Sequence, residues 1–206
     1  LQSNFGTPNH KVIRVSRGFE SHNFKMATGA TYVVQYRRKR SQETDYRDRL
    51  DLLKSGKPRL VIRPSNKHIV VQVIGYKPNG DMVLASAKSS DLVGFGWKYA
   101  KSNIPAAYLT GLLCGKRATD AKVKDAVMDI GLCRSVKGSR IYAALKGVVD
   151  SGLEVAHDEK IFPDESRISG QHTKAAKEMS ANAKGVADAI KNKVAPKTIK
   201  EVKPKK

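Results

Sequence analysis

The positive charge of this chain is concentrated towards its two ends, which restricts a folded core to the middle. Across 206 residues, 39 lysines and arginines face 19 aspartates and glutamates, a net charge of +20. Residues 171–206 contain ten basic and three acidic side chains, and residues 26–66 contain ten and four. Residues 67–170 are nearly balanced, with fifteen and eleven. This pattern is typical of a folded body that carries polycationic segments.

We therefore divide the chain into an extension (1–25), a basic arm (26–58), a body (59–170) and a Lys/Ala-rich tail (171–206). The tail has a thin apolar stripe formed by Met179, Val186, Ile190 and Val194. The stripe predicts a helix that is stable only against a surface. Residues 196–206 have the composition of a disordered segment.

The body begins with the pattern of an antiparallel meander. Residues 59–63 predict a first strand, and residues 64–67 a turn. Residues 68–76 are apolar on nearly both faces, which is typical of a central strand with helices or partners on both of its faces. An Asn-Gly pair at 79–80 predicts a hairpin to a third strand at 82–87.

A helix that begins after Asn103, a favourable N-cap, is expected next. Gly111 and Gly115 leave one of its faces smooth, and we expect that face to lie close on the sheet. A strand at 125–131 and a helix capped by Ser139 follow. The resulting order β-β-β-α-β-α predicts an α/β sandwich with a mixed sheet, a basic N-terminal arm and a basic C-terminal tail.

The net charge indicates a polyanionic partner, because neutralising phosphates releases condensed counterions. No apolar run approaches the ~20 residues of a membrane span. Residues 1–25 have no apolar stretch typical of a secretory signal. We expect nucleic acid as the partner and no membrane, although a basic amphipathic helix on anionic lipid is an alternative.

The residue pattern offers little for catalysis. Cys114 and Cys133 form no C-x-x-C motif, and the five histidines give no zinc spacing, so we interpret both cysteines as small buried hydrophobes; a redox pair is the alternative. Asp125 and Asp129 lie too far apart on a strand to share a metal ion, and we expect each to bond the backbone or a basic neighbour. We expect no enzyme, no metal or other cofactor, and no small-molecule substrate.

Two basic clusters are candidate nucleic-acid sites. The first runs from YRRKR at 36–40 through residues 46–63, where arginines can bind phosphate bidentately and tyrosines can stack on bases. A solvated segment without a partner is the alternative, although this much charge should keep the free arm extended until it meets phosphate. The second, RSVKGSR at 134–140, precedes a helix N-terminus and forms a possible phosphate seat; an ordinary capped turn explains it equally well.

The candidate RNA-binding residues come from the arm, the turn after the first strand and the loop before the last helix. They are Tyr36, Arg37, Arg38, Lys39, Arg40, Tyr46, Arg47, Arg49, Lys54, Lys57, Arg63, Asn66, Lys67, His68, Arg134, Lys137 and Arg140.

Eight stretches of the chain resemble the archaeal branch of a large-subunit ribosomal protein family that binds 5S rRNA and has a shorter bacterial member. They are 36–40 (YRRKR), 45–58 (DYRDRLDLLKSGKP), 59–64 (RLVIRP), 95–98 (FGWK), 105–115 (PAAYLTGLLCG), 129–134 (DIGLCR), 137–140 (KGSR) and 161–165 (IFPDE). Their order and spacing cover most of residues 26–170.

The resemblance implies a structural protein of the cytoplasmic large ribosomal subunit that binds 5S rRNA and helps attach it to 23S rRNA in the central protuberance. It also implies a neighbouring 5S-binding ribosomal protein as a partner, and RNA contacts through the basic arm and the sheet. A DNA-binding or chromatin-like protein is the first alternative, and it predicts comparable affinity for duplex DNA. A nuclease or other RNA-processing enzyme is the second alternative, and it would need carboxylates gathered at strand ends in one cleft.

Residues 26–29 (MATG) resemble the usual start of this family, whereas residues 1–25 have no counterpart in it. The extension is either real or the result of an upstream reading-frame error. If Met26 is the true start, the intact mass of protein from its native source will lack residues 1–25.

Overall fold

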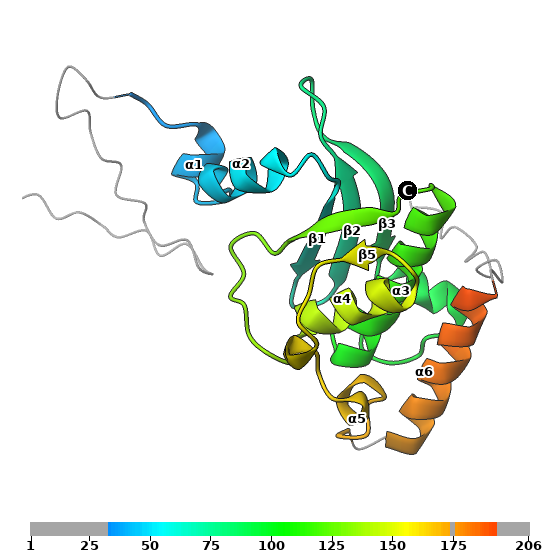
Figure 1. Ribbon diagram of the computed structural model, residues 1–206. Helices are drawn as coiled ribbons and strands as arrows, with labels where there is room; N and C mark the ends of the chain where they lie inside the picture. The colour runs from blue at the N-terminus through cyan, green and yellow to red at the C-terminus, as the bar shows by residue number, and fades with distance from the viewer. Residues whose placement is uncertain (1–32, 174–175, 193–206) are drawn as a thin grey trace, which may run out of the picture. The chain divides into compact units, whose positions relative to one another are not determined.

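The computed structural model describes residues 33–173 and 176–192. The expected extension at 1–25 and the last residues of the tail lie outside this range. The chain divides into two units, Leu1–Thr44 and Asp45–Lys206. Among the described residues of the first unit there is one short helix, α1 (Arg37–Arg40). The second unit contains a five-stranded sheet and the helices that pack on it (Figure 1).

The sheet has the strand order β3-β2-β1-β4-β5. Its first three strands, β1 (Arg59–Pro64), β2 (Ile69–Gly75) and β3 (Met82–Lys88), form the predicted antiparallel meander. β4 (Asp125–Asp129) pairs in parallel with β1, and β5 (Glu154–Val155) pairs in parallel with β4. The prediction of an α/β fold with a mixed sheet is therefore confirmed, while the two-residue edge strand β5 was not foreseen.

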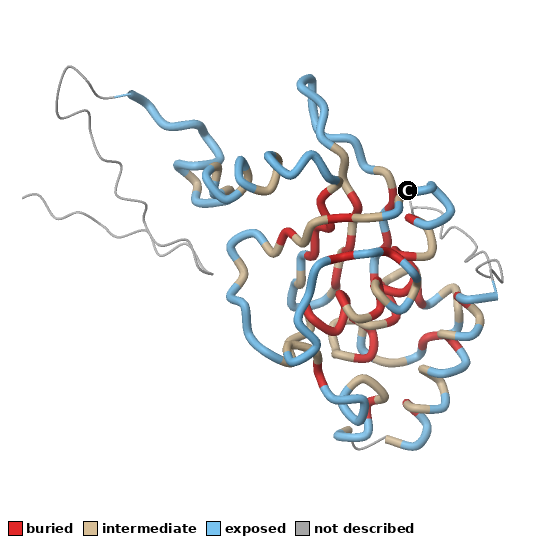
Figure 2. Tube along the Cα trace, viewed as in Figure 1, coloured by how far each residue is buried: buried red, intermediate tan, exposed pale blue. Residues whose placement is uncertain are grey.

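Two helices cover one face of this sheet. α3 (Ile104–Asp120) packs on β2 and β3, and α4 (Arg140–Asp150) packs on α3 and on β1. Figure 2 shows the buried residues gathered between these helices and the strands. The largest side chains of this core that are fully buried include Leu60, Ile62, Ile69, Val71, Val73, Leu109, Leu112, Leu145 and Val148.

The opposite face of the sheet is not covered by a helix layer of the described residues. Along β2, Ile69 and Val71 are completely buried, whereas Val70 and Ile74 on the other face are only half-buried. Tyr76, just beyond the strand, is 58% exposed. β2 lies between β1 and β3, so the prediction of a central strand is confirmed, whereas the helices α3 and α4 both lie on one of its faces. We call the other side the open face.

Glycines let α3 and α4 approach each other, rather than letting α3 approach the sheet as predicted. A Cβ at Gly111 would lie 2.0 Å from the carbonyl oxygen of Ala144 in α4. A Cβ at Gly147 would lie 2.1 Å from the carbonyl oxygen of Tyr108 in α3. The smooth face of α3 is thus a helix–helix contact in which backbone lies against backbone.

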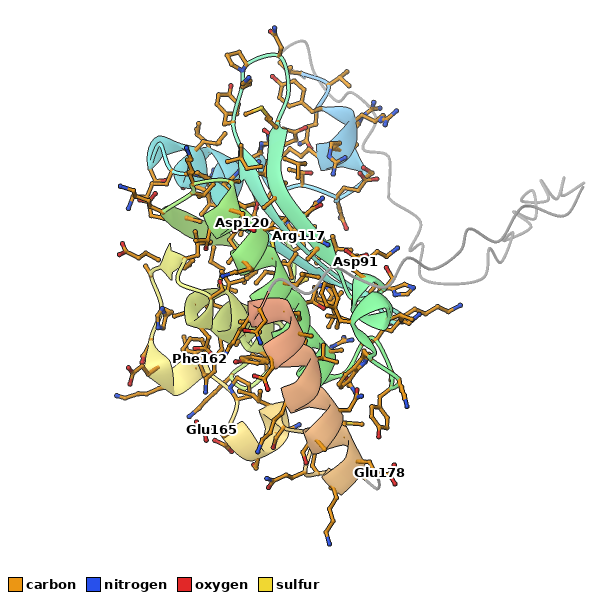
Figure 3. The ribbon with its side chains drawn as sticks, turned by 90° about the vertical axis from the view of Figure 1, so that its right-hand side faces the viewer. Asp91, Arg117, Asp120, Phe162, Glu165 and Glu178 are labelled. Atoms are coloured by element: carbon orange, nitrogen blue, oxygen red, sulfur yellow. The ribbon has the colours of Figure 1, made fainter. Side chains whose placement is uncertain are left out.

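Three short helical segments lie outside the two central helices: η1 (Asp91–Phe95), η2 (Glu159–Ile161) and α5 (Glu165–Ile168). Arg117 of α3 donates to Asp91 at 3.1 Å and to the carbonyl oxygen of Ser86, which fastens α3 to η1 and to the edge strand β3. Figure 3 shows Arg117 directed towards Asp91.

The tail helix α6 (Ala176–Lys191) packs along α3 and η1. Its buried residues Met179, Val186 and Ile190 are three members of the predicted stripe, and the fourth, Val194, lies outside the described residues. The helix therefore packs on the body of its own chain, which supplies the surface that we expected it to need for stability.

Residues 46–54 do not form the extended arm that their charge suggested. They form a helix, α2 (Tyr46–Lys54), which a side-chain N-cap and an ion pair within the helix stabilise. The Asp45 side chain accepts the Arg47 N–H at 2.8 Å, and Lys54 bonds Asp51 one turn earlier.

β4 also ends two residues before its predicted end. The carboxylate of Asp129 accepts the backbone N–H of Gly131, whose φ of +58° turns the chain out of the strand.

The glycine contact between α3 and α4 leads to a stability prediction. Replacing Gly111 or Gly147 with alanine should destabilise the fold by about 1–3 kcal/mol or more, because backbone must move to admit the methyl group. Gly185 of α6 is the control, since nothing lies within 4 Å of its Cβ position. Gly185→Ala should leave stability unchanged or raise it by up to about 1 kcal/mol. Urea unfolding of the three variants checks this, and equal costs at all three positions would contradict it.

The two helix caps generate a second prediction. Asn103 accepts the Ala106 N–H at 2.9 Å, so Asn103→Ala should cost about 1 kcal/mol. Ser139 occupies the N-cap position of α4 as predicted, but its side chain makes no cap hydrogen bond and its Oγ is buried without a partner. Because the capping hydrogen bond expected from the sequence is not made, Ser139→Ala should cost much less stability than Asn103→Ala. If thermal unfolding showed a larger loss of stability for Ser139→Ala than for Asn103→Ala, this prediction would be wrong.

Candidate nucleic-acid interface

Four cations of the basic arm lie in a single helical turn. Arg37, Arg38, Lys39 and Arg40 make up α1, and all four side chains are exposed. Tyr36 precedes them and is 72% exposed. Arg38 bonds Thr44 Oγ1 at 2.9 Å and faces Glu43 at 3.4 Å, both within the same unit. Four adjacent cations and an exposed ring therefore stand on one short element.

In the second unit, α2 contributes further candidates from the sequence. Arg47 is exposed, Tyr46 is half-buried and Lys54 is paired with Asp51 at 2.7 Å. Lys57 follows the helix and pairs with Asp125 at the start of β4 at 2.8 Å. The hydrogen bond and charge of Asp125 raise the pKa of Lys57. This pairing confirms the expectation that Asp125 bonds a basic neighbour.

Arg140 brings two candidate segments together at one end of the sheet. Its Nη1 donates to the carbonyl oxygens of Ser65 and Ser102, each at 3.1 Å. The turn between β1 and β2 and the loop before α4 therefore meet here. Arg140 was predicted to contact phosphate; in the structure its side chain bonds the backbone of the loops that carry Ser65 and Ser102.

The side chains around that end are mostly accessible. Asn66, Lys67, Arg134 and Lys137 are exposed. His68 is half-buried, and its Nδ1 is buried without a hydrogen-bond partner.

A chain of alternating charges, which we call the ion-pair chain, runs across the open face. Arg59 of β1 donates to Asp81 at 2.7 Å and to Asp129 at 2.8 Å. Asp81 also pairs with Arg49 of α2 at 2.8 Å, and Asp129 also pairs with Arg63 of β1 at 2.8 Å. Two candidate arginines, 49 and 63, are thus held by carboxylates of the body.

Asp129 is ionised by its surroundings. Burial raises its pKa, but the hydrogen bond from Arg63, the charges of Arg63 and Arg59, and the Gly131 N–H together outweigh burial and lower the pKa. This confirms that Asp129 bonds basic and backbone neighbours, as expected from the sequence.

Arg59, Asp81 and Asp129 were not among the candidate site residues. Arg59 and Arg63 lie four positions apart on β1, which was a usable signal, because residues an even number of positions apart on a strand share a face. The pairing of that face with Asp81 and Asp129 was not visible, since the partners lie 22 and 70 residues away in the chain.

Other kinds of site find little support in the structure. Among residues 33–173 and 176–192 no group of three or more His, Cys, Asp or Glu side chains could hold a metal ion. Both cysteines are free: Cys114 is buried, which raises its pKa to about 12, and Cys133 is half-buried. None of the described helices is long and apolar enough to cross a membrane.

The pairing of Asp129 predicts a specific dependence of stability on pH. Asp129→Asn should cost roughly 3 kcal/mol at neutral pH, because it breaks a buried pair. The folded-state pKa lies below the unfolded value of about 4, so the contribution is present above that pH and is lost as the pH falls through the folded value. The difference in free energy of unfolding between wild type and Asp129→Asn should be constant above about pH 5 and should decrease below about pH 4. Denaturant unfolding from pH 7 to 3 measures it, and a gap that widens in acid would contradict this assignment.

Sequence comparisons match this chain to one family of ribosomal proteins. Residues 30–125 and 118–158 match the family described as ribosomal large subunit proteins 60S L5 and 50S L18. The large ribosomal subunit protein uL18 of Korarchaeum cryptofilum is 54% identical over 147 residues, which are 71% of this chain and 75% of the relative. The uL18 proteins of Halobacterium salinarum and Methanobrevibacter smithii are 53% and 51% identical over 147 residues, with 80% and 76% of each relative covered.

These matches confirm the resemblance found in the sequence. They also confirm that the protein is a structural component of the large subunit of the cytoplasmic ribosome rather than an enzyme. The chain belongs to the uL18 family of large-subunit ribosomal proteins and is of the archaeal type.

Proposed function

We propose that the chain binds 5S rRNA and helps attach it to 23S rRNA in the central protuberance of the large subunit. The observation that carries this proposal is the arm, where four consecutive exposed cations lie beside the exposed ring of Tyr36. Such a group can neutralise several phosphates while the tyrosine stacks on an unpaired base.

The body supplies a second basic surface for the same RNA. The turn carrying Lys67 and the loop carrying Arg134 and Lys137 meet through Arg140 at the end of the sheet where α3 and α4 begin. The positive ends of both helix dipoles add to these charges. Two basic surfaces, one on each unit, suit a folded RNA or two RNA molecules.

Irregular RNA fits these features better than duplex DNA does. α1 is a single turn, too short to fill a major groove as a recognition helix does. The exposed tyrosine offers stacking, which requires an unstacked base. The family resemblance further supports a neighbouring 5S-binding ribosomal protein as a partner in the assembled subunit.

The arm provides the test. Replacing Arg37, Arg38, Lys39 and Arg40 with alanine should strongly lower 5S rRNA affinity at low salt. The plot of log K against log salt should flatten by roughly 0.7–0.9 for each phosphate that the arm no longer neutralises. The body should stay folded, because none of the four is buried. Filter binding across a salt series, with circular dichroism as a folding check, makes the measurement.

A matched control removes the same charge elsewhere. Lys160, Lys177, Lys184 and Lys191 are exposed and lie on η2 and α6. Replacing these four with alanine should change the salt slope less than the arm variant does. Duplex DNA of equal length serves as competitor. Equal slopes for the two variants would refute the role of the arm, and equal competition by DNA would favour a general nucleic-acid-binding protein.

A further inference from the structure

The ion-pair chain on the open face alternates in sign over five side chains: Arg49, Asp81, Arg59, Asp129 and Arg63. Four contacts of 2.7–2.8 Å join them. They come from α2, the turn before β3, β1 and the end of β4. One continuous set of contacts therefore links four parts of the second unit.

The middle of this chain is buried and its ends are accessible. The Arg59 side chain is 4% exposed and that of Asp129 is 8% exposed. At the ends, Arg49 is 33% exposed and Arg63 is 43% exposed. A buried guanidinium must be paired, so Arg59 requires both carboxylates in fixed positions. Asp81 also pairs with Arg49, and Asp129 also pairs with Arg63, so each carboxylate holds one accessible arginine in addition to Arg59.

The backbone holds Arg63 more firmly still. Its Nη1 donates to the carbonyl oxygens of Ile62 and Asp129, at 3.0 and 2.8 Å. A Cβ at Gly131 would lie 2.9 Å from the guanidinium carbon, so the loop after β4 closes directly over this group. The positive φ of Gly131 makes that closure possible.

We infer that Asp81 and Asp129 are positioning residues for RNA binding, which fix the guanidinium groups of Arg49 and Arg63 on the open face before RNA arrives. This inference rests on the proposed function. An arginine that is already held loses less side-chain freedom when it meets phosphate. Three arginines share two aspartates, so the ion-pair chain keeps one net positive charge. Its accessible cations are the two at its ends, Arg49 and Arg63.

Positioning and simple electrostatics predict opposite results when one carboxylate is removed. Asp81→Asn makes the protein more positive by one charge, and counting charges alone predicts tighter RNA binding with a steeper salt dependence. Positioning predicts weaker binding, because Arg49 and α2 lose their anchor. Asp81 suits the test better than Asp129, since its side chain is 25% exposed and it lies in a turn that accepts asparagine or serine.

The experiment measures 5S rRNA binding by the full chain and by four variants across a salt series. Asp81→Asn and Asp81→Ser should each bind roughly three- to tenfold more weakly at every salt concentration, mainly through faster dissociation. The salt slope should not steepen. Asp81→Glu keeps the carboxylate and should restore most of the affinity. Glu178→Gln makes the same charge change on α6, where Figure 3 shows Glu178 at the end of the helix pointing away from the body, and should leave affinity unchanged.

The outcomes separate this inference from the proposed function. If wild type fails to bind 5S rRNA, the proposed function is wrong. If wild type binds and both neutralised Asp81 variants, folded by circular dichroism, bind as tightly or more tightly, the positioning role is overturned. If both variants unfold, Asp81→Glu decides: a folded variant that keeps most of the wild-type affinity supports the inference. A folded variant that binds as weakly as the three- to tenfold loss expected of the neutralised variants overturns it.

Discussion

The burial of Arg59 is the constraint on which the open face of this protein depends. A guanidinium at 4% exposure costs too much free energy to leave unpaired, and its two terminal nitrogens donate one to Asp129 and the other to Asp81. Asp81 ties the turn before β3 to β1, and Asp129 ties the end of β4 to the same strand. A sheet face with no helix layer among the described residues is thereby ordered by charge instead of by apolar packing.

The covered face is organised by a different contact, the close approach of α3 and α4. Gly111 and Gly147 bring the two backbones together, so both helices fit on one side of the sheet. The core then lies between one helix layer and one sheet face. The other face has no helix layer among the described residues, and there the ion-pair chain joins β1 to β4 and to the turn before β3.

The parts of the fold that follow from local chemistry could be predicted from the sequence. The hairpin at Asn79-Gly80 and the cap at Asn103 depend on residues a few positions apart, and both were placed correctly. Features set by distant residues could not be foreseen. Arg140 bonds Ser65 across 75 positions, and no local pattern shows that contact. The helix α2 was not predicted, because the many cations of this segment suggested an extended arm. The signals that favour the helix are the cap from Asp45 and the pairing of Asp51 with Lys54.

Chemical footprinting of lysines in the complex with 5S rRNA tests the account most directly. The exposed residues Lys39, Lys67 and Lys137 stand on the arm and on the loops at the end of the sheet. They should lose reactivity towards an acylating reagent when the RNA binds, as read by mass spectrometry. The exposed Lys177, Lys184 and Lys191 of α6 should react as in the free protein. Protection of the α6 lysines with unchanged reactivity of Lys39, Lys67 and Lys137 would contradict the account.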